Sequence, residues 1–245
     1  MKRLLKMPSL LAAVFLICAG CSNLPGRPTP ESIPIDPDNV TDFNLLYGKN
    51  CSGCHGAELK NGAALSLGDP VYLAIADDVT LHKVVTNGIP GTSMPAFAKS
   101  AGGMLTDSQV DIIVRGIRQR YSRPDALAGV TPPPYVATES GDATRGAAVY
   151  DTFCASCHGP GGKGGGKASS IVDGSFLALL TDQELRTLVI VGRPDLGAPD
   201  WRNNVPGRPM SSQEISDVVA WLSAKRPQFP GRPYPHAAEP AGARP

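Results

Sequence analysis

The sequence of 245 residues predicts an all-α protein built from two small helical domains in tandem. One observation is that CSGCH at 51–55 returns as CASCH at 154–158. A second is that each half of the chain closes with apolar residues at helical spacing behind a capping box. The third is that no segment shows the alternation of apolar and polar residues that predicts a β-strand.

The first element along the chain is an export signal, predicted for residues 1–20. It begins with basic residues and continues into an apolar run at 10–19, which is too short to span a bilayer comfortably. An uncleaved membrane anchor is the alternative interpretation. Ala19-Gly20 before Cys21 resemble the end of a bacterial lipoprotein signal, although Cys18 stands where an aliphatic residue is common. The resemblance implies a lipid on Cys21, which would hold the chain on the periplasmic side of a bacterial membrane.

Proline-rich stretches mark the boundaries of the predicted domains. We expect a tether at 21–38, a stiff linker at 124–139 and a flexible tail at 228–245. The two domains then occupy residues 39–123 and 140–227. The formal net charge of the chain is +1, which gives no basic surface for nucleic acid.

The two CxxCH motifs are the attachment signature of c-type haem. Residues three apart face the same way on a helical turn, so both thiols can bond to the two vinyl groups on one porphyrin edge. The histidine that follows can offer a ring nitrogen to the iron. Two motifs in equivalent settings therefore predict two covalently attached haems c, held by Cys51, Cys54 and His55 and by Cys154, Cys157 and His158.

Other uses of these cysteines are a redox-active CxxC pair, a disulfide or half of a zinc site. A zinc site would require each histidine to point at the same metal as both cysteines, which their adjacency makes awkward. The presence of two CxxCH motifs in one exported chain favours haem over these alternatives.

The similarity between the two halves extends beyond the motifs. FNLLYGKNC matches GAAVYDTFC upstream, and LTDSQVDIIVRGI matches MSSQEISDVVAWL downstream. Each half therefore predicts a helix, the CxxCH turn, a loop, a second helix, another loop and a last helix. Capping boxes mark the starts of three of these helices, at Thr106–Gln109, Thr181–Glu184 and Ser211–Glu214.

This order of elements resembles the class I cytochrome c domain, and two copies would cover residues 39–227. Tandem diheme cytochromes c of bacteria look similar, including diheme subunits of some terminal oxidases. The resemblance implies that the first and last helices of each domain cross closely, often at a glycine. Gly146 fits that place in the second repeat, whereas Phe43 occupies it in the first and predicts a wider crossing.

In that family a methionine in a loop well after CxxCH is the second axial ligand of the iron. Met94 fits this place in GIPGTSMPAF, because Pro95 favours an extended backbone before it. A packing role for Met94, or ligation by the nearby Met104, is the alternative. The matching stretch GRPDLGAPDW of the second repeat has Ala198 opposite Met94.

Three possibilities remain for the second iron. Met210 is the first choice as its ligand, although its counterpart Leu105 indicates a packing role instead. The iron could also keep an open position. The third possibility is an unusual ligand, for which the candidates are His236, Asn203 and Asn204.

Two further patterns have ordinary interpretations. GGKGGGK at 161–167 satisfies a phosphate-loop pattern, but Ala168 follows it without the hydroxyl that would bind magnesium, so we expect a flexible loop. His82 and Arg186 occupy matched helix positions, where we expect solvated side chains rather than contacts with a haem propionate.

The predicted function is the transfer of single electrons, by an electron carrier or an electron-transfer subunit of an oxidoreductase complex rather than by an enzyme. The partners implied are redox proteins, namely a dehydrogenase, a quinol-oxidising complex or a terminal oxidase. The alternative is that an open second iron binds a small molecule, as a peroxidase-like or sulfur-oxidising centre. We predict no catalytic residues, because no acid–base constellation accompanies residues 192–210.

Overall fold

The computed structural model describes residues 34–227. The predicted export signal, Cys21, most of the tether and the tail with His236 lie outside the described residues. Residues up to Val40 belong to a unit separate from the rest, and its described part contains a short 3-10 helix, Pro37–Asn39. Within the described range no helix is both long and apolar enough to cross a membrane.

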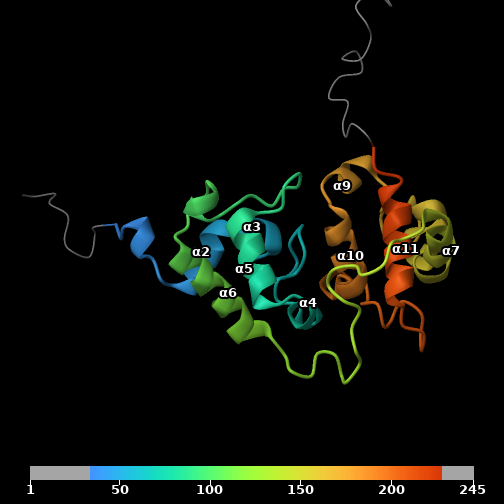
Figure 1. The fold of residues 1–245 in the computed structure, drawn as a ribbon, viewed down its shortest axis with the longest axis horizontal. Helices are drawn as coiled ribbons and strands as arrows, with labels where there is room; N and C mark the ends of the chain where they lie inside the picture. Colours follow the sequence, from blue (N-terminus) through green and yellow to red (C-terminus); the bar gives the residue numbers. More distant parts are fainter. Residues whose placement is uncertain (1–33, 228–245) are drawn as a thin grey trace, which may run out of the picture. The chain divides into compact units, whose positions relative to one another are not determined.

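The predicted all-α class is confirmed, since the described residues from Thr41 onward form helices joined by loops (Figure 1). The only β pairings among them are two isolated bridges, Ala98–Leu105 and Arg193–Ala198. The helices of the first repeat are α2 (Phe43–Asn50), α3 (Ser52–His55), α4 (Pro70–Ile75), α5 (Asp78–Asn87) and α6 (Asp107–Tyr121).

The second repeat has the same order of elements. Its helices are α7 (Ala143–Phe153), α8 (Ala155–His158), α9 (Gly174–Ala178), α10 (Asp182–Val191) and α11 (Ser212–Ser223). The three predicted capping boxes are present at the starts of α6, α10 and α11. In each box the side chain of the capping residue accepts a hydrogen bond from the backbone N–H of the third helical residue. The side chain of that third residue accepts one from the backbone N–H of the capping residue, so residues close in sequence fix these helix starts.

The cores of both repeats come from the apolar stripes that the sequence predicts on α6 and α11. These stripes are buried, and their members are Val110, Ile113, Val114 and Ile117 on α6, and Ile215, Val218, Val219 and Leu222 on α11.

The last helix of the second repeat crosses the first helix at Gly146, as predicted. A Cβ atom added to Gly146 would lie 2.1 Å from the carbonyl oxygen of Asp217, so only glycine allows α7 to approach α11 this closely. The contact between α2 and α6 in the first repeat is less extensive, which agrees with the wider crossing that Phe43 predicts.

Arg186 holds the linker against the second repeat. A solvated side chain was expected at this position, but Arg186 is only 2% exposed. Its Nε and Nη2 donate to the carbonyl of Pro134 at 3.1 and 3.0 Å, and its Nη1 and Nη2 donate to the hydroxyls of Ser216 and Ser212. These partners come from segments distant in sequence, so helical position alone could not reveal them. The matched His82 is partly exposed and pairs with Asp111, as expected for a surface position.

Candidate functional site

Each CxxCH motif forms one helical turn that continues from the helix before it. In the first repeat the carbonyl of Cys51 accepts the N–H groups of Cys54 at 3.2 Å and of His55 at 3.0 Å. In the second repeat the carbonyl of Cys154 accepts the corresponding N–H groups of the motif at 3.1 and 2.9 Å. The two thiols of each motif thus share one turn, as attachment to one porphyrin edge requires.

The four cysteines of the motifs carry free thiols, so a disulfide does not form in either pair. Burial raises the pKa of Cys51 to about 11 and that of Cys154 to about 12. A reactive cysteine of a redox-active CxxC pair has a lowered pKa instead. The environment of these thiols therefore argues against the redox-active alternative.

Both histidines are oriented by a backbone carbonyl. Nδ1 of His55 lies 2.7 Å from the carbonyl oxygen of Leu65, and Nδ1 of His158 lies 2.8 Å from that of Ser169. Because Nδ1 then carries the proton, Nε2 keeps a lone pair that can bind a metal ion. The donor set of two thiols and one oriented imidazole at each motif fits haem c.

Burial lowers the pKa of His55, and the positive charge of Arg193 lowers it further. His55 is only 8% exposed, so its ring is a neutral imidazole at physiological pH. Neutral imidazole is the form that binds iron.

A loop returns to the motif in each repeat. The N–H of Ala64 donates to the carbonyl of Cys54 at 2.9 Å, and the N–H of Ala168 donates to that of Cys157 at 3.0 Å. The glycine-rich stretch 161–167 is thus part of the loop that orients His158, in agreement with the loop expected there.

A tyrosine and a glycine complete each turn, and no role was predicted for the glycines from the sequence. The hydroxyl of Tyr47 donates to the carbonyl of Gly56 at 2.7 Å, and Tyr150 donates to Gly159 at 2.5 Å. The φ angles of the glycines are +83° and +73°, so both are in the left-handed region. The signal was available, since glycine follows the histidine in both CSGCHG and CASCHG.

The backbone confirms that Ala198 takes the place of Met94. The N–H of Ile89 donates to the carbonyl of Met94 at 2.9 Å, and the N–H of Arg193 donates to that of Ala198 at 3.0 Å. Both loops follow a helix that ends at a glycine with positive φ. The second repeat therefore keeps the loop but offers a methyl group where the first offers a thioether.

Met210 occupies the place of Leu105. Each donates its N–H to the carbonyl of an aromatic residue, Leu105 to Phe97 at 2.7 Å and Met210 to Trp201 at 2.9 Å. Both side chains are buried, at 5% and 3% exposure. The sulfur of Met210 lies 3.9 Å from the amide nitrogen of Asn204. These contacts are those of a packed core residue.

The remaining candidate ligands lie in other surroundings. The amides of Asn203 and Asn204 both donate to Asp200, at 3.1 and 3.2 Å. Met104 is 77% exposed.

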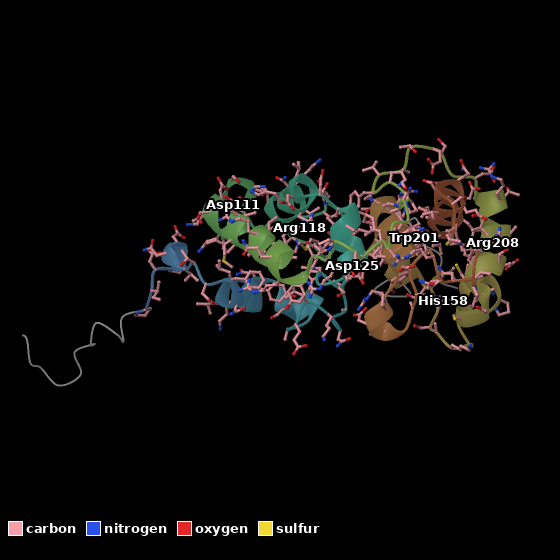
Figure 2. All side chains as sticks on the ribbon, turned by 90° about the horizontal axis from the view of Figure 1, so that it is seen from below. Asp111, Arg118, Asp125, His158, Trp201 and Arg208 are labelled. Carbon is pink, nitrogen blue, oxygen red and sulfur yellow. The ribbon has the colours of Figure 1, made fainter. Side chains whose placement is uncertain are left out.

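Near the second motif, Arg208 lies over the ring of Phe153, with 4.7 Å between its guanidinium carbon and the ring centroid. Figure 2 labels Arg208 together with His158.

Both repeats match families of known proteins. Residues 143–225 match the family described as cytochrome c. Residues 38–115 match the family described as cytochrome c oxidase, cbb3-type, subunit III. The fold and the paired CxxC motifs thus agree with two cytochrome c domains, which implies covalently bound haem c.

Individual relatives match most of this chain or about half of it. The cytochrome bc1 complex cytochrome c subunit of Mycobacterium tuberculosis is 24% identical over 87% of this chain and 74% of its own length. The corresponding subunit of Mycobacterium leprae is 24% identical over 87% of this chain and 72% of its own. The cbb3-type cytochrome c oxidase subunit CcoP of Cereibacter sphaeroides is 30% identical over 49% of this chain and 39% of its own.

Proposed function

Since this chain is a class I c-type cytochrome with two domains in tandem, we propose that it transfers single electrons between redox proteins. The observation that supports this most directly is the repeated site, at which two thiols on one turn accompany a histidine whose Nδ1 is held by a carbonyl. The domains occupy residues 39–123 and 140–227 in this proposal.

The chain's residues have separate tasks at each site. Cys51 and Cys54 hold the first haem and His55 binds its iron, while Cys154, Cys157 and His158 do the same for the second haem. Met94 would supply a thioether to the first iron. A haem with histidine and methionine ligands supplies reversible one-electron transfer, and the thioether favours the ferrous state.

The partners are components of a respiratory chain. Two relatives are named as subunits of a cytochrome bc1 complex and one as a subunit of a cbb3-type oxidase. We therefore place this chain between a quinol-oxidising complex or a dehydrogenase and a terminal oxidase. The N-terminal signal and a lipid on Cys21 would keep it at the periplasmic face of a membrane, within reach of such partners.

A second function is favoured by one specific observation at the second site. Ala198 replaces the thioether, and Met210 has the packing contacts of Leu105. Ligation by Met210, which the sequence predicts, would require this buried side chain to leave its place. If this side chain stays in place, the second iron would keep an open position. This domain would then bind a small molecule as well as transfer electrons.

The visible spectrum of the purified, dithionite-reduced protein, recorded before and after addition of carbon monoxide, tests both proposals. Two c-type haems per chain are expected by pyridine haemochrome assay. An unchanged spectrum after carbon monoxide would mean that both irons are closed and that the chain is an electron carrier alone. A response from half of the haem would assign an open position to one site. The absence of c-type bands would overturn the proposed function.

A further inference from the structure

The loop after α10 reaches from the second domain to the first. Nη2 of Arg193 donates to the carbonyl of Gly62 at 2.8 Å, and the carboxylate of Asp195 accepts the N–H of Asn61 at 2.9 Å. Arg193 and Asp195 also pair with each other at 2.8 Å. Their side chains are only 14% and 7% exposed, so this ion pair is largely shielded from water.

The segment that this pair holds belongs to the loop that orients His55. Gly62 lies two residues before Ala64, whose N–H binds the carbonyl of Cys54, and three before Leu65, whose carbonyl binds the His55 ring. Asn61 has a φ of +60°, a conformation that non-glycine residues seldom adopt. The bond from its N–H to Asp195 stabilises that conformation from the other domain.

The charged pair is a property of one repeat. Arg193 and Asp195 fall opposite Ile89 and Gly91 of the first repeat, which carry no charge. The second domain has thus lost the methionine of this loop at Ala198 and has gained an ion pair that contacts the first domain.

We propose that Arg193 and Asp195 form an interdomain clamp that positions the His55 loop and sets the reduction potential of the first haem. This inference rests on the proposed function, because it assumes a haem at His55. Charges in a shielded place act on a redox centre more strongly than exposed ones, since water and salt screen them less. A positive charge disfavours the ferric state and a negative charge favours it, so the two members act in opposite directions.

Two substitutions that each break the pair should therefore shift the potential with opposite signs. Arg193→Gln leaves the carboxylate unbalanced and should lower the potential of the first haem. Asp195→Asn leaves the guanidinium unbalanced and should raise it. Arg193→Lys, which keeps the charge without the planar fork, should leave the potential close to that of the wild type. Arg115→Gln is the matched control, because it removes the same charge from an exposed place on the first domain.

The experiment combines spectroscopic redox titration of the full-length holoprotein with hydrogen exchange measured by mass spectrometry. The transition of the first haem is identified as the one that Met94→Leu displaces. We expect opposite shifts in the two neutralised variants, and faster exchange in peptides covering residues 57–66 of Arg193→Gln, with no change in residues 159–169. Shifts of the same sign, or no larger than that of Arg115→Gln, together with unchanged exchange, would overturn the clamp. Two c-type haems in the same samples would show that the proposed function still stands.

Discussion

The ring of Phe43 lies directly over Gly116, where an added Cβ atom would come within 2.1 Å of the ring. The second domain has the reverse arrangement, with Gly146 on its first helix and Trp221 on its last. Phe43 is opposite Gly146 in the repeat, and Gly116 is opposite Trp221. In each domain one aromatic residue and one glycine therefore lie where the first and last helices cross. The aromatic residue is on the first helix in the first domain and on the last helix in the second domain.

Replacement of the crossing glycines should destabilise each domain to a different extent. Gly146→Ala brings a Cβ atom to 2.1 Å from a main-chain oxygen, which cannot move without shifting α11. We expect it to lower the free energy of unfolding by about 1–3 kcal/mol, as overpacking does. Gly116→Ala meets the buried ring of Phe43, and it should cost less because a side chain can shift without moving a helix backbone. Urea denaturation followed by circular dichroism measures both.

The control is Gly48→Ala on the exposed face of α2, where an added Cβ atom meets nothing within 4 Å. It should stabilise the protein by about 0.5–1 kcal/mol, because alanine loses less backbone entropy than glycine in a helix. A Gly146→Ala variant as stable as the wild type would contradict the crossing described above.

Local signals in the sequence were enough to predict three helices and the CxxCH turn in each domain, but the short helices α4 and α9 were not predicted. Capping boxes and apolar spacing depend on residues a few positions apart, and so does the CxxCH turn. Gly146 was predicted because the resemblance supplied its role. The compensating Gly116 was not, since its purpose depends on Phe43, which lies far from it in the sequence.

Contacts between distant segments account for the remaining differences. The burial of Arg186 depends on the carbonyl of Pro134 in the linker. The role of Arg193 depends on the carbonyl of Gly62 in the other domain. In both cases the acceptor is a backbone oxygen, which every residue possesses, so no side-chain pattern identifies it.

Acid should weaken the second domain through Asp217. This carboxylate is 3% exposed, and it accepts bonds from Nε and Nη2 of Arg145 at 2.8 Å each and from the N–H of Asp142 at 2.8 Å. The bonds from Arg145 are the main reason that the pKa of Asp217 is lowered. A lowered folded-state pKa contributes stability above the unfolded value of about 4 and loses it as the pH falls through the folded value.

We therefore expect Asp217→Asn to reduce the dependence of urea stability on pH below about pH 4, compared with the wild type. Arg145→Gln should have a similar effect, because it removes the main cause of the shift. Midpoints of urea denaturation measured from neutral pH downward test this. The same slope in the wild type and in both variants would disprove the assignment.

The tyrosine of each site should stabilise the turn after the haem histidine. Tyr47→Phe and Tyr150→Phe each remove a hydroxyl that donates to a glycine carbonyl, at 2.7 and 2.5 Å. The two carbonyls keep only their bonds from the backbone N–H groups of Leu59 and Gly162. We expect a loss of about 0.5–1.5 kcal/mol in each case, since the ring itself is kept. Denaturation curves of the two variants measure the loss, and curves that superimpose on the wild type would show that these bonds contribute nothing.

The proposed open position at the second iron can be tested by restoring the missing sulfur. Ala198→Met places a thioether where the loop of the first domain holds Met94, since both residues accept the same backbone bond. If the second iron is open, this variant should lose the carbon monoxide response of the reduced wild type, and Met94→Ala should add a response at the first site. Met210→Leu should bind carbon monoxide as the wild type does, because leucine fills the equivalent place in the first domain. A response that appears only in Met210→Leu would instead identify Met210 as the ligand of the second iron.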